Sequence, residues 1–124
     1  MLIHCCGCDE KIEARLTDGG EVYPHRRDLS ALPFWMCDTC GNFVGCHYKT
    51  NRPTMPLGCM PTPEINNARR HIHAKLDPIW QGGKMTRKEI YKKIGERLGR
   101  GYHTANIRSI REAREVYRVI CEYG

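Results

Sequence analysis

Two pairs of cysteines constrain this chain more than any other feature of its sequence. Two residues, Cys6 and a glycine, separate Cys5 from Cys8, and Cys37 and Cys40 have the same spacing. Two thiolates at this spacing can both reach one ion from a tight turn, and two such turns supply the closed tetrahedral ligand set that structural Zn²⁺ prefers. Because four thiolates leave no open position for catalysis, the spacing predicts one structural zinc. Cys6 is a rival of Cys5 for the first ligand, and free buried cysteines are the alternative to any metal.

The length and the N-terminus favour metal thiolates over disulfides. The chain has 124 residues, which is room for one modest domain, and eight of them are cysteines. Its first residues turn polar after position 3 and lack the apolar stretch of a signal peptide, and no apolar run approaches a membrane span. We therefore expect a soluble cytoplasmic protein with no membrane partner, in a reducing compartment where disulfides are rare.

The two halves of the chain differ in composition. Residues 1–61 hold six Lys/Arg against seven Asp/Glu, whereas residues 62–124 hold fourteen against seven. Seven of the eight cysteines and six of the seven prolines lie before residue 64. These patterns predict an α+β protein with a zinc-ribbon-like β module at 1–50, a Pro-rich surface connector at 51–63, and a basic helical module at 64–124. We expect the helices to pack on the ribbon, so that one domain results.

In the first half, turn residues separate short apolar segments. Residues 12–16 and 21–23 flank a Gly-containing turn at 17–20, and residues 34–36 and 42–45 flank the second cysteine pair in the same way. Both arrangements predict β-hairpins. Each cysteine pair is thereby expected at a turn or at a strand end.

The second half predicts three amphipathic helices. The first has Thr62 as its cap and Pro63 at its first position, and it reaches about residue 79 with a kink or a restart at Asp77-Pro78. Thr86 and Glu89 form a capping box that opens the second helix, and Gly99 closes it.

The third helix begins near Thr104 or Ser109 and carries basic residues at helical spacing. Arg108, Arg111, Arg114 and Arg118, the arginine row, recur every three or four residues. A planar guanidinium binds two phosphate oxygens, so the arginine row predicts contact with nucleic acid, either DNA or RNA. A solvated face and an acidic protein partner are the alternatives. Further candidate contacts are Arg87 and Lys88.

Other cysteines and histidines carry weaker signals. Cys46 and His47 are adjacent on a predicted strand, so they point to opposite faces, and packing, auxiliary metal binding and catalysis stay open for Cys46. Cys59 and Cys121 are expected to pack as small apolar residues. His73 and Asp77 share a helical face, where the carboxylate either holds the imidazole or caps the turn of Pro78.

Several longer segments together resemble a known family. They are the N-terminal CxxC, Tyr23-Pro-His-Arg26, Pro33-Phe-Trp-Met-Cys-Asp-Thr-Cys40, Val44-Gly-Cys-His47, Pro56-Leu-Gly58, His73-Ala-Lys-Leu-Asp-Pro-Ile-Trp80 and Met85-Thr-Arg-Lys-Glu-Ile-Tyr91. In this order they resemble the small zinc-finger-containing domain family of tailed bacteriophages and prophages, over about residues 5–103. The resemblance implies a zinc-binding fold and a phage origin, hence the host cytoplasm, but no reaction. The extra thiol at Cys6 and the arginine-rich C-terminal helix depart from the family pattern.

The resemblance also covers polar residues that zinc does not need. They are His25, Arg26, His47, His73 and Asp77, which we call the polar set, and they imply a polar site between the ribbon and the first helix.

Three functions follow from these observations. The first is a zinc-binding protein that contacts nucleic acid, or a complex that processes it, through the basic helical face. The second is an interaction module that modulates a host or phage protein. The third is a hydrolase that uses the histidines and the aspartate of the polar set. We expect a binding protein rather than an enzyme and assign no catalytic residue.

Overall fold

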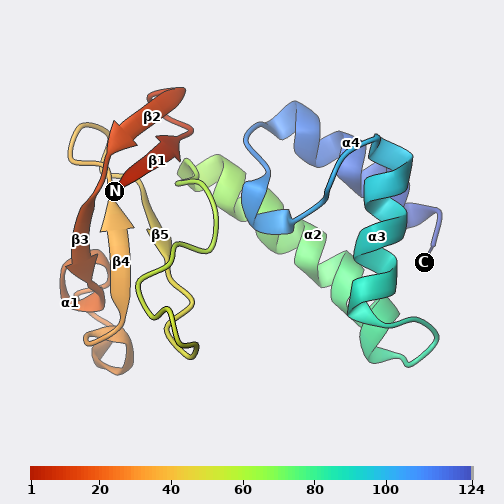
Figure 1. The fold of residues 1–124 in the computed structure, drawn as a ribbon, viewed down its shortest axis with the longest axis horizontal. Coiled ribbons are helices and arrows are strands. Elements are labelled where there is room, and N and C mark those ends of the chain that lie inside the picture. Colours follow the sequence, from red (N-terminus) through yellow and green to blue (C-terminus); the bar gives the residue numbers. More distant parts are fainter. Residues whose placement is uncertain (124) are drawn as a thin grey trace. The chain divides into compact units, whose positions relative to one another are not determined.

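The structure is a computed structural model that describes residues 1–123, and it places short strands before three longer helices (Figure 1). The strands are β1 (Leu2–Cys5), β2 (Glu10–Glu13), β3 (Arg15–Asp18), β4 (Pro33–Met36) and β5 (Phe43–Gly45). The helical elements are α1 (Gly19–Val22), η1 (Arg27–Leu29), α2 (Pro63–Gln81), α3 (Arg87–Leu98), η2 (Thr104–Asn106) and α4 (Ile110–Cys121). The α+β class is confirmed.

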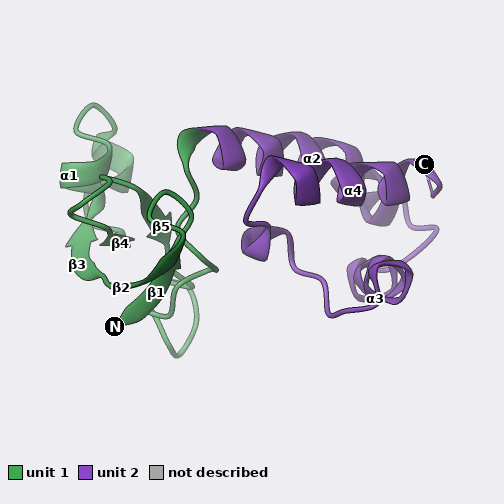
Figure 2. Ribbon diagram, turned by 90° about the horizontal axis from the view of Figure 1, so that it is seen from above, with its two compact units in different colours: residues 1–63 green, residues 64–124 purple. Residues whose placement is uncertain are grey.

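The contacts within the chain define two compact units, residues 1–63 and residues 64–124 (Figure 2). Unit 1 contains every strand, and unit 2 contains almost all of α2 together with α3 and α4. The packing of both modules into one domain stays a prediction. None of the helices in the described part of the chain is long and apolar enough to cross a membrane.

Unit 1 holds two small antiparallel sheets. In the first sheet β1 pairs with β2, so that Ile3 lies opposite Ile12. In the second sheet β4 lies between β3 and β5, with Trp35 opposite Val44 on the β5 side. The predicted hairpin around the second cysteine pair is therefore confirmed as β4–β5.

The predicted hairpin around residues 17–20 is wrong, because these residues start a helical turn. The Asp18 carboxylate accepts hydrogen bonds from the backbone N–H groups of Gly20 and Glu21 and so caps α1. A side chain at Gly19 would place its Cβ 1.8 Å from the carbonyl oxygen of Leu29, so only glycine permits this close approach. The chain then returns through η1, and the partner of β3 is β4.

The core of unit 1 includes part of the segment expected to be a surface connector. Its buried residues are Ile3, Cys5, Ala14, Cys37, Val44 and Met60. Met60 is fully buried, its N–H donates to the His4 carbonyl, and its own carbonyl accepts from the Cys6 N–H, both at 2.9 Å. The surface prediction for 51–63 is thus wrong at its end, because an apolar side chain there completes a small core that the strands leave open.

In unit 2 the predicted helix boundaries are largely confirmed. The hydroxyl of Thr86 accepts from the Glu89 N–H at 3.1 Å at the start of α3, and Gly99 ends this helix with a φ of 75°. The Ser109 hydroxyl accepts from the Glu112 N–H at 3.1 Å, so α4 begins at the later of the two predicted sites. At both N-caps, the hydroxyl oxygen of a short side chain accepts a hydrogen bond from an N–H group of the first turn, which has no partner within the helix.

The helices of unit 2 bury apolar side chains and one arginine. The structure gives α2 as one helix that continues through Pro78, so no restart occurs there. Its residues Ile72 and Leu76 are buried, as are side chains of α3 and α4 such as Ile94 and Ile120. Arg69 is 7% exposed, and its guanidinium donates to the Ile107 carbonyl from Nη2 at 2.6 Å and from Nε at 3.2 Å.

Candidate metal centre and basic face

The two cysteine pairs lie in turns of the same geometry. Cys5 is the last residue of β1 and Cys37 follows β4 directly. In the first turn the Asp9 N–H donates to the Cys5 carbonyl at 2.7 Å, and in the second the Gly41 N–H donates to the Cys37 carbonyl at 2.7 Å. Asp9 and Gly41 both adopt positive φ, 55° and 74°. Each pair of thiols therefore projects from a tight turn, as the spacing predicts.

These turns bring the four thiols together into what we call the cysteine cluster, Cys5, Cys8, Cys37 and Cys40. Their sulfur atoms all lie within 4.8 Å of one another. A tetrahedral zinc with Zn–S bonds of about 2.3 Å needs sulfur atoms about 3.8 Å apart. The Cys8 and Cys37 sulfurs are 3.7 Å apart, and those of Cys8 and Cys40 are 3.0 Å apart. The donor set and its size thus fit one structural zinc ion.

The electrostatics of the cysteine cluster also fit a cation. Burial disfavours the Cys5 thiolate, but the N–H groups of Cys8 and Gly7 and the Asn42 amide together outweigh it and lower the pKa of Cys5. Hydrogen bonding with the Cys40 sulfur, together with desolvation and the other neighbouring thiols, raises the pKa of Cys8 above its ordinary value. A dication that accepts all four thiolates removes this mutual repulsion.

Cys6 lies outside the cysteine cluster, which resolves the ambiguity about the first ligand. The Cys6 sulfur lies 3.8 Å from that of Cys59, which is buried. Cys46 is also buried, and burial raises its pKa, which is unfavourable for a nucleophile. Cys121 is exposed on α4, so the expectation of apolar packing is wrong for this residue.

The polar set is divided between the two units. His25, Arg26 and His47 are exposed in unit 1, where Arg26 forms an ion pair with Asp28 at 2.8 Å. In unit 2 the members are His73 and Asp77. A common site formed by the polar set stays a prediction.

His73 and Asp77 do contact each other within α2. The Nδ1 atom of His73 lies 3.4 Å from the Asp77 carboxylate, and the indole N–H of Trp80 donates to the same oxygen at 3.1 Å. The imidazole and the indole together hold the carboxylate on one face of the helix.

All four members of the arginine row are exposed, but they differ in position. Arg108 precedes the cap of α4, whereas Arg111, Arg114 and Arg118 belong to the helix itself. The expectation of one continuous helical row is therefore wrong at its first residue, because Ser109 is extended and starts the helix after it. Arg87 and Lys88 are exposed in the first turn of α3, and the Arg87 guanidinium lies 4.9 Å from the centre of the Tyr91 ring.

The acidic residues of the α4 region pair with arginines outside the arginine row. Arg100 donates to Glu112 at 3.0 Å and lies 4.0 Å from Glu115. Arg97 of α3 holds Glu122 through two hydrogen bonds. Among residues 1–123, no carboxylate forms an ion pair with the side chains of the arginine row. The positive charge of this surface is thus not neutralised within the described chain.

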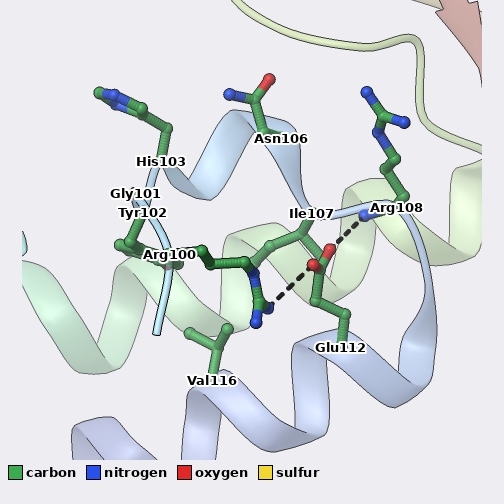
Figure 3. A pocket seen from close by; sticks show the side chains of 9 residues that line it. All are labelled: Arg100, Gly101, Tyr102, His103, Asn106, Ile107, Arg108, Glu112 and Val116. Atoms are coloured by element: carbon green, nitrogen blue, oxygen red, sulfur yellow. Dashed lines mark hydrogen bonds and ion pairs between the residues drawn. The ribbon is translucent and has the colours of Figure 1, made fainter. Parts of the chain in front are cut away.

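A hollow of about 310 Å³ lies beside the Arg100–Glu112 pair (Figure 3). Glu112 also accepts from the backbone N–H of Arg108 at 2.8 Å, so its two oxygens are both engaged. In Figure 3 the side chains of His103, Asn106 and Arg108 extend away from this pair. The Arg108 backbone thus serves the helix start, while its guanidinium is left exposed.

Comparison with known proteins supports the assignment of the cysteine cluster as a zinc site. Residues 1–123 match the model of a family described as a zinc-finger-containing domain. The searches of curated proteins and of solved structures give no significant match. Because the family model spans essentially the whole chain and the four thiols form a set of the size that one zinc ion needs, this chain belongs to the zinc-finger-containing domain family.

Proposed function

We propose that this chain is a zinc-stabilised protein that binds nucleic acid through the exposed arginine row. The resemblance of its sequence to phage proteins leads us to propose, in addition, a phage-encoded protein that acts in the host cytoplasm. The nucleic-acid partner rests on one observation. Glu112, Glu115 and Glu122 are held by Arg97 and Arg100, which leaves the arginine row without carboxylate partners among the described residues.

This division of charges favours a polyanionic ligand. Exposed arginines are usually accompanied by acids at helical spacing, which stabilise the isolated helix. Here the acids face α3 and the loop after it, whereas Arg111, Arg114 and Arg118 keep their guanidinium groups for an external partner. Guanidinium groups bind phosphate oxygens in a planar fork, and phosphate contacts supply most of the affinity of non-specific nucleic-acid binding.

Salt dependence of binding tests the proposal. Each phosphate contact on duplex DNA contributes about −0.9 to the slope of log affinity against log salt, so four contacts give a slope of about −3 to −4. Replacing Arg111 and Arg114 by alanine is expected to make the slope shallower by about two and to weaken all sequences alike. Fluorescence anisotropy with labelled duplex and single-stranded oligonucleotides measures both effects.

A matched control separates the arginine row from net charge. The double variant Arg27→Ala and Arg52→Ala removes the same two charges from exposed positions of unit 1. It is expected to leave the slope nearly unchanged. Wild-type protein that binds neither duplex nor single strands at low salt contradicts the proposal, and the acidic protein partner then becomes the better explanation.

A further inference from the structure

A second hollow lies between α2 and α4, which run side by side in unit 2 (Figures 1 and 2). Its volume is about 370 Å³, and its lining is mostly apolar. Ile72 and Ala113 lie in it as buried residues, and Ala68 is half-buried. Because the two alanines end at Cβ, the helices leave room between them that a larger side chain would fill. We call this hollow the α2–α4 groove.

The exposed residues of the α2–α4 groove are aromatic or basic. Tyr117 is 43% exposed, and His71 faces the groove from the other helix. Arg114 and Arg118, two members of the arginine row, also line it. Flat rings and uncompensated guanidinium groups thus surround an apolar floor.

We propose that the α2–α4 groove receives an unstacked base of single-stranded nucleic acid, with Arg114 and Arg118 on the neighbouring phosphates. The inference rests on the proposed function and specifies its substrate class. Charge complementarity selects a polyanion, and an apolar floor bordered by a tyrosine and a histidine suits the face of a base. In a duplex the faces of the bases are covered by their neighbours, so only a single strand can offer one.

The substitution Tyr117→Ala is the direct test. Stacking of a base on an aromatic side chain accounts for about 5- to 150-fold in affinity, and we expect a loss in this range for single-stranded oligonucleotides. Affinity for a duplex of the same length is expected to stay within about twofold, because the arginine row is intact. Tyr117→Phe retains the ring and is expected to bind single strands like the wild type.

A second variant tests the α2–α4 groove without changing its exposed aromatic and basic residues. Ala68→Leu fills the space from α2 and leaves every charge in place, so we expect the same selective loss for single strands. Circular dichroism and a melting curve establish that each variant is folded.

The outcomes distinguish this inference from the proposed function. Equal affinity of Tyr117→Ala and wild type for single strands, with salt-dependent binding retained, overturns the inference and leaves the proposed function standing. Absence of binding to any nucleic acid overturns both. Binding of an acidic amphipathic peptide in place of oligonucleotides, lost in Tyr117→Ala, also overturns both and assigns the groove to a protein partner.

Discussion

At the scale of single residues, Cys5 and Cys6 show how the end of a strand separates two identical side chains, because Cys5 is the last residue of β1 and Cys6 is the first residue of the turn that follows. The Cys5 side chain is fully buried and its sulfur joins the cysteine cluster, whereas the Cys6 sulfur lies near that of Cys59. The Cys6 N–H donates to the Met60 carbonyl at 2.9 Å, so the backbone of Cys6 is fixed by the segment that carries Cys59 while Cys5 is left to the cysteine cluster.

Serine substitutions test this assignment. Cys5→Ser is expected to abolish stoichiometric zinc binding and cooperative unfolding, because the free energy of metal binding in such small sites is largely folding free energy. Cys6→Ser is expected to retain one zinc per chain. Native mass spectrometry measures the metal content, and circular dichroism measures the unfolding. Zinc retained in Cys5→Ser but lost in Cys6→Ser would reassign the first ligand.

At the scale of elements, the arrangement of unit 2 depends on Arg69, which in the sequence cannot be told from an exposed arginine. Arg69 is buried in α2, and its guanidinium reaches the carbonyl of Ile107, which follows η2. Arg70, the next residue, is exposed. One guanidinium therefore connects the longest helix to the loop that precedes α4.

Replacing each of these arginines by methionine separates a structural role from the loss of charge. Arg69→Met leaves the buried Ile107 carbonyl without this donor and is expected to lower the free energy of unfolding by about 1–3 kcal/mol. Arg70→Met removes the same charge from the surface, and a change under about 0.5 kcal/mol is expected. Urea denaturation followed by circular dichroism gives both values, and equal effects would refute the structural role.

Local sequence patterns predicted those helices whose first residues include a capping side chain or a proline. The caps at Thr86 and Ser109 and the proline at the start of α2 were sufficient, because each satisfies or removes N–H groups within its own turn. The segment at 17–20 was misassigned, because Asp18 as a helix cap and Asp18 as a turn residue look alike in sequence. The difference is the approach of the Leu29 backbone to Gly19, a contact that only the tertiary structure supplies.

At the scale of the whole molecule, the cysteine cluster was predictable except for the choice between Cys5 and Cys6, and the surroundings of α4 were not. Ligand spacing alone specifies a closed zinc site, because the metal imposes the geometry. The pairing of Arg97 with Glu122 and of Arg100 with Glu112 joins residues up to 25 positions apart, so the sequence gives no sign of which charges neutralise one another. The α2–α4 groove is hidden for the same reason, since its two alanines lie on different helices.

The titration of the cysteine cluster makes zinc binding dependent on pH. Neighbouring thiols raise the pKa of Cys8, so this ligand must release a proton when the metal binds. Protons compete with zinc as the pH falls, and the affinity for zinc is expected to fall with it. Calorimetric titration in buffers of different ionisation enthalpy measures the proton release, which is expected to be at least one per zinc at pH 7. Zinc affinity that does not change between pH 5 and pH 8 would contradict this.

The burial of Met60 ties the end of the connector to the same small core that contains Cys5 and Cys37 of the cysteine cluster. Only Pro61 and Thr62 separate this anchored residue from the start of α2. Loss of zinc would release the strand pairing of Met60 along with the small core of unit 1, and the connector from residue 51 onward would become a free tether. A longer flexible link lowers the effective concentration at which two joined binding surfaces meet. A protein that uses both units on one ligand would thus lose avidity when its zinc is withdrawn, even though every arginine of α4 is still in place.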